Sequence, residues 1–324
     1  MFRAALLTPR KSRQQTLVMK PARKLHDGLK ERRLVGDGAM GTQLMLAGLE
    51  QGNCGEHWNL THPDRVLAIQ RRYVEAGADC IITNTFGGSR RMLQRHGHAD
   101  DLQAINRAGV QIARQAFGDR EGYVLGDLGP LGAILEPYGD LPQADALAAY
   151  TEQATALVDA GADALIIETQ TSLEELGTAI DAAKAAGAPC IIASIAYDLS
   201  ADKTFYVTMM GVLPEQAAQF VEQRGAQVVA LNCGTGMDMI GAAKVASIYR
   251  ESCGLPVMVQ PNAGLPVLEN LKAVYKQSAA EMALGVPSAL RAGANIIGSC
   301  CGSTSEHTRA IREIVDQWSD RDRL

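Results

Sequence analysis

The chain is poor in aromatic residues and has no long uninterrupted apolar segment. Phe, Trp and Tyr make up 5% of the 324 residues, although 47% of the residues are hydrophobic. No apolar run approaches the roughly 20 residues that a membrane-spanning helix needs, so we expect a soluble chain that makes no contact with a membrane. Abundant glycine (32 residues) and alanine favour helices packed closely on a sheet.

The chain also has no hydrophobic signal peptide, and its number of cysteines is odd. The seven cysteines are Cys54, Cys80, Cys190, Cys233, Cys253, Cys300 and Cys301. Their odd number and wide spacing favour free thiols in a reducing cytoplasm. Cys80 and Cys190 lie in apolar runs and are expected in the core, whereas Cys54 is expected to line the rim of a site.

Basic residues are scarce outside the first 33 positions. Those 33 positions hold ten Lys and Arg against Asp27 and Glu31, which leaves 21 basic and 34 acidic residues in the rest of the chain. An acidic body without a basic stripe argues against a nucleic-acid partner. Residues 1–30 are predicted to be a disordered basic extension. A transit-type segment, a polyanion-binding arm and a translation start at Met19 remain alternatives.

A recurring phrase marks where helices give way to strands. Glu75-Ala-Gly-Ala-Asp, Asp159-Ala-Gly-Ala-Asp and Arg291-Ala-Gly-Ala-Asn each follow a helical pattern and precede an apolar run. Glycine here is the residue just after a helix, where positive φ is common. The seven junctions fall at Gly77, Gly122, Gly161, Gly187, Gly225, Gly254 and Gly293. Strands are predicted at 34–37, 79–83, 123–127, 163–168, 189–195, 227–232, 256–260 and 294–298. Helices are predicted near 63–76, 99–117, 144–160, 173–186, 214–223, 236–252, 271–284 and 306–318.

The predicted strands are continuously apolar, as parallel strands covered on both faces should be. Eight strands alternating with eight helices predict an α/β fold, a single-domain (β/α)8 TIM barrel over residues 31–324. A doubly wound sheet that binds a dinucleotide is the structural alternative. Gly36, Gly38 and Gly41 fit the glycine spacing of that fold, but the next acidic residue is Glu50, no strand follows at once and Asp37 would face the phosphates. We therefore favour the barrel.

Barrel enzymes carry their chemistry where the strands end, and two of these ends carry cysteine. The last predicted strand runs into Cys300-Cys301-Gly302, and the sixth ends at Asn232-Cys233-Gly234. Three cysteines with an open fourth position are typical of a catalytic zinc site. The alternative is that the three cysteines are ordinary and one of them happens to end a strand. Asp37, Thr85, Gly126-Asp-Leu-Gly-Pro130 and Glu168 fall at other strand ends.

These motifs resemble the zinc-dependent homocysteine S-methyltransferases. The matching motifs are Asp37-Gly-Ala-Met-Gly-Thr42, Thr83-Asn-Thr-Phe86, Glu168-Thr169, Asn232-Cys-Gly234, Pro261-Asn-Ala-Gly264 and Gly298-Ser-Cys-Cys-Gly302. They run in the family's order over roughly residues 31–318. Within the family, the chain is most similar to the homocysteine-binding module of cobalamin-dependent methionine synthase.

The resemblance implies that Cys233, Cys300 and Cys301 hold Zn²⁺, with the homocysteine sulfur in the fourth position. A zinc-bound thiol is deprotonated, so the metal supplies a thiolate that attacks an activated methyl group, and no catalytic residue is expected beyond the metal site.

The amino acid part of homocysteine needs sites of its own. Asp37 and Glu168 suit the substrate ammonium, and backbone amides around Thr85 and Phe86 suit its carboxylate. Asn232 is also predicted to bind the substrate. Like Asn262, it is expected to orient groups around the zinc.

The methyl donor stays open at this stage. A methyl-corrinoid carried by a separate protein, or a small donor such as S-methylmethionine or betaine, would serve. Another thiol as the acceptor, or a non-catalytic barrel that binds zinc and a thiol, are the alternatives. Two departures from the family pattern concern the substrate: Gly-Ser-Cys-Cys-Gly replaces Gly-Gly-Cys-Cys-Gly, and the segment 197–211 is bulkier and contains methionine.

Overall fold

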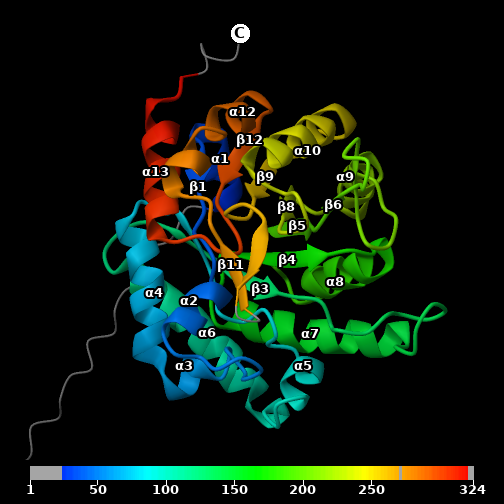
Figure 1. The fold of residues 1–324 in the computed structure, drawn as a ribbon. Helices are drawn as coiled ribbons and strands as arrows, with labels where there is room; N and C mark the ends of the chain where they lie inside the picture. Colours follow the sequence, from blue (N-terminus) through cyan, green and yellow to red (C-terminus); the bar gives the residue numbers. More distant parts are fainter. Residues whose placement is uncertain (1–23, 270–271, 320–324) are drawn as a thin grey trace, which may run out of the picture.

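Eight parallel strands form one sheet in the computed structural model, which describes residues 24–269 and 272–319 (Figure 1). The strands pair in the order β1-β12-β9-β8-β5-β4-β3-β2, and a parallel bridge between Gly36 and Cys80 joins the two ends of this order. The sheet is therefore a barrel, and the predicted TIM-barrel fold is confirmed. Its strands are β1 Leu34–Val35, β2 Cys80–Ile82, β3 Tyr123–Leu128, β4 Ala164–Gln170, β5 Ile191–Ile195, β8 Val228–Asn232, β9 Val257–Gln260 and β12 Ala294–Ile297.

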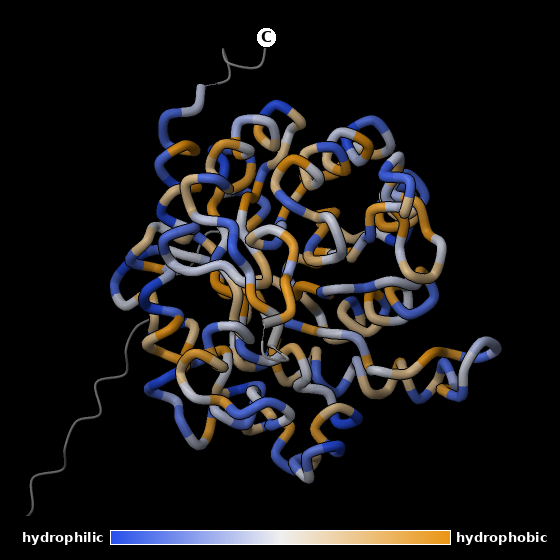
Figure 2. The backbone as a smooth tube through the Cα atoms, viewed as in Figure 1, coloured by the Kyte–Doolittle hydropathy of each residue, from blue (hydrophilic) through white to orange (hydrophobic). Residues whose placement is uncertain are grey.

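Alternate residues of each strand pack on opposite sides of the sheet, as strand geometry requires. In β4, Ala164 and Ile166 belong to the cluster inside the barrel, whereas Leu165 and Ile167 belong to the layer beneath the helices. Because both sides are buried, the strands are apolar throughout. Figure 2 shows these hydrophobic stretches along the central strands, with hydrophilic stretches frequent in the surrounding helices and loops.

Helices surround the barrel and alternate with its strands. The helices over the barrel wall are α4 Pro63–Glu75, α6 Leu102–Phe117, α7 Gln143–Asp159, α8 Leu173–Ala185, α9 Pro214–Arg224, α10 Met239–Ser252, α12 Val286–Arg291 and α13 Ser305–Gln317. Shorter helices are α2 Gly41–Leu46, α3 Trp58–Thr61, α5 Arg90–Gln94, η1 Ala99–Asp101 and α11 Ala279–Ala283. No helix in the described ranges is both long and apolar enough to span a membrane.

One further helix, α1 (Leu25–Glu31), precedes the first strand. Its Leu25 and Leu29 are buried in the cluster that fills the barrel interior, so this part of the basic N-terminal region is packed against the barrel. The remainder of the predicted extension, residues 1–23, lies outside the described residues.

The predicted helix over residues 271–284 is wrong in its first half. The chain forms an antiparallel hairpin there, β10 (Pro266–Glu269) with β11 (Lys272–Tyr275), and α11 begins only at Ala279. Ser278 caps α11 by accepting a hydrogen bond from the amide of Glu281, which fixes that start. A second, smaller hairpin pairs β6 (Asp198–Leu199) with β7 (Tyr206–Val207). Both hairpins follow barrel strands, β9 and β5.

Five of the seven predicted glycine junctions have the expected positive φ, from 74° at Gly187 to 103° at Gly77. Gly122 and Gly254 do not, and these two predictions are wrong. Helix α6 instead ends at Gly118 with φ 58°, and α10 ends in extended backbone at Cys253.

Candidate metal and substrate site

Three cysteine side chains gather where β8 and β12 end. Cys233 directly follows β8, and Cys300 and Cys301 follow β12 after a two-residue turn. The Sγ atom of Cys301 lies 3.8 Å from that of Cys233 and 3.9 Å from that of Cys300. All three sulfur atoms lie within 4.8 Å of one another, and all three residues are partly buried. The structure therefore brings together the three predicted metal ligands.

Strand β9 lies between β8 and β12 and holds the two cysteine segments in register. The Cys233 amide donates to the carbonyl of Gln260, 3.3 Å away, and the Cys300 amide donates to the carbonyl of Pro261 at 2.7 Å. Although β9 supplies no thiol, it sets the distance between the strands that do.

Asn232 organises the backbone beside the cluster. Cys233 (φ 56°) and Thr169 (φ 59°) both have left-handed conformations, which cost non-glycine residues about 1–3 kcal/mol each. Asn232 Oδ1 accepts from the Thr169 amide at 3.0 Å and the Ser194 hydroxyl at 2.7 Å. Its Nδ2 donates to Thr169 Oγ1 at 2.7 Å and lies 3.9 Å from Cys300 Sγ. This fully buried amide therefore stabilises the strained turn and orients the metal-binding side.

The geometry of the three thiols fits a tetrahedral metal. Thiolates bound to one zinc ion at about 2.3 Å are about 3.8 Å apart, close to the two shorter distances here. Asn262 lies on the same side, and its Nδ2 donates to the carbonyl of Gly234 at 3.0 Å. Its buried Oδ1 has no hydrogen-bond partner among the described residues, so it too could meet a cation.

The three thiols shift one another's pKa values. Hydrogen bonds from Cys300 and then Cys301 hold the pKa of Cys233 well below its usual value. The same contact with Cys233 raises the pKa of Cys300 and of Cys301. A divalent cation would allow the other two thiols to ionise as well, as coordinated thiols do.

Three carboxyl groups lie near the C-terminal ends of the barrel strands β1, β3 and β4. Asp37 follows β1, Asp127 lies in β3 and Glu168 lies in β4. Burial raises the pKa of Asp37 and of Asp127 well above the usual value, and the Glu168 charge raises both further. Burial and then the Cys233 thiolate raise the pKa of Glu168 to about 7. The site therefore combines buried acids with thiols, and this combination favours binding of a positively charged group.

Two of these carboxyl groups also have a buried oxygen without a hydrogen-bond partner among the described residues. Asp37 Oδ2 accepts from the Ile82 amide at 2.8 Å, but Asp37 Oδ1 and Asp127 Oδ1 are buried without a partner among the described residues. An unpartnered buried oxygen costs free energy unless a ligand binds it.

The loop after β2 carries the two residues predicted to bind a carboxylate. The Thr85 side chain is buried, and its amide and hydroxyl are occupied by the carbonyls of Thr83 and Asp127. The Phe86 side chain is 38% exposed, and its amide has no acceptor among the described residues. Of the two amides, that of Phe86 is the available one.

Sequence reasoning assigned no role to two residues near these groups. Glu56 accepts from the Gly87 amide at 2.7 Å, so it fixes the turn after Phe86. Tyr275, in the hairpin that was predicted to be a helix, packs on Gly302 and hydrogen-bonds Cys301, and burial together with that thiol raises the pKa of Tyr275. A helix predicted over this segment gave no indication that Tyr275 would lie beside the thiols.

The remaining cysteines stay apart from the cluster. Cys54 is buried and donates to Glu56 Oε2 at 3.3 Å. Cys80 and Cys190 are buried in the core, as predicted. Asp127 is one of the polar residues near the strand ends, but no motif around it in the sequence predicts a role in the site.

Comparison with known proteins gives the family of this chain. Residues 34–315 match the family model described as homocysteine S-methyltransferase. Methionine synthase of Mycobacterium tuberculosis is 35% identical over 306 residues, and that of Mycobacterium leprae is 34% identical over 313. These matches cover 90% and 91% of this chain but 25% of each relative, so the chain spans about a quarter of their length.

Solved structures show the same fold. The metallated form of the homocysteine methyltransferase MmuM from Escherichia coli superimposes with a TM-score of 0.75 at 20% identity, over 90% of this chain and 100% of that one. Its oxidized form gives 0.73 at 22% identity, over 91% and 100%. Because the family model matches most of the chain, this protein belongs to the homocysteine S-methyltransferase family.

Proposed function

We propose that this enzyme transfers a methyl group to the sulfur of homocysteine, with Zn²⁺ held by Cys233, Cys300 and Cys301, and that the product is methionine. The observation that carries the proposal is the triangle of three thiols at the open end of the barrel, with no fourth histidine, cysteine or carboxylate in the cluster among the described residues. When bound, the metal would lower the pKa of the substrate thiol from about 8.5 and so supply a thiolate at neutral pH.

Buried carboxylates support recognition of an amino acid. Asp37 and Glu168 would accept hydrogen bonds from the substrate ammonium, and Asp127 adds a third acidic group. The positive charge would lower the raised pKa values of these acids and give the unpartnered oxygens of Asp37 and Asp127 a donor. Charge and hydrogen bonding thus favour the same substrate group.

The substrate carboxylate would meet the free amide of Phe86. Glu56 holds the next amide, that of Gly87, so the turn is fixed before the substrate arrives. A preorganised donor costs little conformational entropy on binding.

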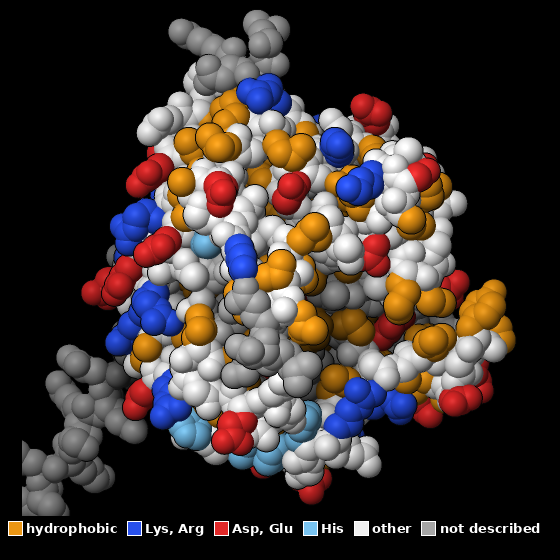
Figure 3. All heavy atoms as spheres, viewed as in Figure 1, with side chains coloured by type: hydrophobic (Ala, Val, Ile, Leu, Met, Phe, Trp, Pro, Cys, Tyr) orange, Lys and Arg blue, Asp and Glu red, His pale blue; other side chains and the backbone are white. Residues whose placement is uncertain are grey.

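A methyl-corrinoid carried by a separate protein is the donor that the surface favours. Segments that follow the barrel strands, among them parts of α2, α10 and β10, expose large apolar side chains, and Figure 3 shows several apolar side chains near the middle of the face that Figure 1 presents. Exposed apolar patches of this kind mark interaction surfaces. We define this apolar rim as Met45, Leu46, Phe86, Ile134, Tyr138, Phe205, Met209, Met210, Ile240, Leu265, Val267 and Leu268.

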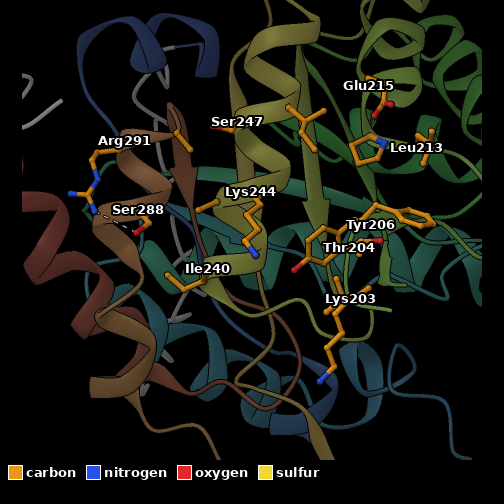
Figure 4. Close-up of a pocket in the computed structure, with 16 residues that line it drawn as sticks. Lys203, Thr204, Tyr206, Leu213, Glu215, Ile240, Lys244, Ser247, Ser288 and Arg291 are labelled. Atoms are coloured by element: carbon orange, nitrogen blue, oxygen red, sulfur yellow. Dashed lines mark hydrogen bonds between the residues drawn. The ribbon is translucent and has the colours of Figure 1, made fainter. Parts of the chain in front are cut away.

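A groove of about 910 Å³ adjoins the rim at Phe205 and Ile240, between the β6–β7 hairpin and helices α9, α10 and α12 (Figure 4). Lys203, Lys244 and Arg291 line it against a single acid, Glu215, on an otherwise acidic molecule. Acidic side chains of a docking carrier would complement these cations. A small methylated donor would need neither the groove nor the rim.

Free thiols support a cytoplasmic location, because the seven cysteines form no disulfide.

The test is a matrix of thiols and donors with the zinc-loaded protein. Homocysteine and other small thiols are each offered with an isotopically methylated corrinoid protein, free methylcobalamin, S-methylmethionine or betaine, and labelled products are measured by mass spectrometry. We expect labelled methionine from homocysteine, formed fastest with the corrinoid protein. Zinc binding without methylation of any thiol would show a non-catalytic barrel, and preference for another thiol would refute the acceptor.

Charge placed on the rim tests the donor separately. Met209 is 74% exposed, and Met209→Lys should slow turnover with the corrinoid protein but not with free methylcobalamin. Leu284→Lys is the matched control, since Leu284 is 81% exposed and lies outside the rim. Equal rates for all three proteins would contradict docking on the rim.

A further inference from the structure

Histidine is concentrated on one small part of the surface. Of the six histidines in the chain, four fall at positions 57, 62, 96 and 98. Figure 3 shows a group of histidine side chains on the face below the apolar rim. None of the four belongs to the thiol cluster or to the acids beside it.

Three side chains of this surface converge. His57 directly precedes α3 and His98 directly precedes η1, and their imidazole rings stack with centroids 3.7 Å apart and planes inclined by 20°. His98 Nδ1 lies 3.6 Å from Asp101 Oδ2. One ligand atom from each of these residues lies within 4.8 Å of the others.

The backbone holds both histidines in place. The carbonyl of His57 accepts from the amides of Leu60 and Thr61, at 3.0 and 3.1 Å. The His98 amide donates to the Leu93 carbonyl at 3.0 Å. Two segments more than 30 residues apart thus present imidazoles to each other from fixed turns, so only side-chain rotation separates them from a shared ligand.

The imidazoles also keep lone pairs available. Neutral imidazole is the form that binds metals, and the Asp101 carboxylate supplies negative charge. Two nitrogens and one carboxylate oxygen suit borderline divalent ions such as Zn²⁺, Co²⁺ and Ni²⁺.

We propose that His57, His98 and Asp101 form a second metal site, which binds a divalent transition-metal ion with water in the remaining positions. Ligand atoms of one tetrahedral ion at about 2.1 Å are about 3.4 Å apart, so the His98–Asp101 distance needs to shorten only slightly. A shared ion would require the stacked rings to rotate apart, and both His57 and His98 are partly exposed to solvent.

The ion would connect the segment that ends at His57 with the segment that begins at His98. Glu56 precedes His57 and binds the Gly87 amide beside Phe86, so the site would stiffen the loop next to the substrate. The proposal concerns metal binding and stands whether or not the proposed methyl transfer is correct.

The test counts metal ions with the thiol site already filled. Protein loaded with one equivalent of Zn²⁺ is titrated with Ni²⁺ by calorimetry, and bound metals are counted after gel filtration. We expect one equivalent of Ni²⁺ to bind, and the variants His57→Phe, His98→Phe and Asp101→Asn each to weaken binding by at least tenfold. Phenylalanine keeps the ring stack but removes the lone pair, and Asp101 is exposed enough that its variant should fold normally.

Matched controls identify the ligands. His26→Ala removes a histidine from α1, and His62→Ala removes one next to the proposed site. Both should bind Ni²⁺ like the wild type. The proposal is overturned if no Ni²⁺ binds, if binding persists unchanged in the His57 and His98 variants, or if His62→Ala alone abolishes it. Circular dichroism of each variant separates loss of the site from loss of the fold.

Discussion

Replacing Asn232 with alanine should weaken metal binding through groups that never touch the ion. The wild-type amide satisfies the Thr169 amide, the Thr169 hydroxyl and the Ser194 hydroxyl. Each buried group left without a partner costs about 1–3 kcal/mol, although the two hydroxyls can rotate and water can enter the vacated space. We therefore expect Asn232→Ala to lower the free energy of unfolding by about 3 kcal/mol.

Metal affinity should fall as well. Without Asn232, Thr169 loses the contacts that hold its left-handed backbone, and the turn into Cys233 loses its support. Loss of a partner that orients metal ligands typically reduces affinity 10–100-fold. Zinc affinity is measured by competition with a coloured chelator, and stability by urea denaturation of the metal-free protein.

Asn106 provides the control for a buried asparagine far from the thiols. Its Nδ2 donates to the carbonyls of Gly88 and Leu102, at 2.8 and 2.9 Å. Asn106→Ala should lose comparable stability and keep wild-type zinc affinity. If Asn232→Ala loses stability yet binds zinc within twofold of the wild type, the reasoning about the turn is refuted.

Three other outcomes are expected. Gly234→Ala would place Cβ 1.8 Å from the carbonyl oxygen of Tyr197, at a φ of 86°, so the urea midpoint should fall by the equivalent of about 3 kcal/mol or more, and an unchanged midpoint would contradict the clash. Burial and then Glu168 raise the pKa of Asp127, so the folded state keeps a proton that the unfolded chain releases and stability falls as pH rises above about 4. Asp127→Asn should therefore gain relative stability with rising pH, by up to about 1.4 kcal/mol per unit, in urea titrations at several pH values; a pH-independent difference would count against this. Glu168→Gln removes a charge-assisted contact with the substrate ammonium and should raise KM for homocysteine about tenfold or more in steady-state assays, whereas an unchanged KM would exclude that role.

The barrel and the thiol cluster could be predicted because both follow from repeated patterns. Parallel strands in a barrel end at the same face, so two strands that end in cysteine must bring their thiols to one opening. Cys233 could be paired with Cys300 and Cys301 from this rule alone, without knowledge of any side-chain position.

Non-local contacts explain what could not be predicted. Residues 272–275 look helical beside the alanine-rich stretch that follows, but they pair with residues 266–269 across a turn. Gly122 matches the junction phrase only loosely, and Gly118 ends its helix instead. Local sequence does not reveal which of two nearby glycines takes positive φ.

Side-chain hydrogen bonds set the same limit within the site. The sequence shows polar residues at the strand ends but not which of their atoms are already occupied. The Thr85 hydroxyl donates to the Asp127 carbonyl, and the Asn232 side chain already accepts a hydrogen bond from the Thr169 amide. Whether the oxygens of Asp37 and Asp127 have hydrogen-bond partners depends on the folded positions of other residues, which the sequence does not show.

The position of the thiols along the chain has a consequence for how the protein is turned over. Cys233 and Cys301 are 68 positions apart, so an ion held between them closes a loop as a disulfide would. For a loop of this length, such a cross-link lowers the entropy of the unfolded chain and so raises its free energy by about 4 kcal/mol at room temperature. Metal-starved molecules would open more often along β9, β12 and the final helix, and proteases would degrade them first.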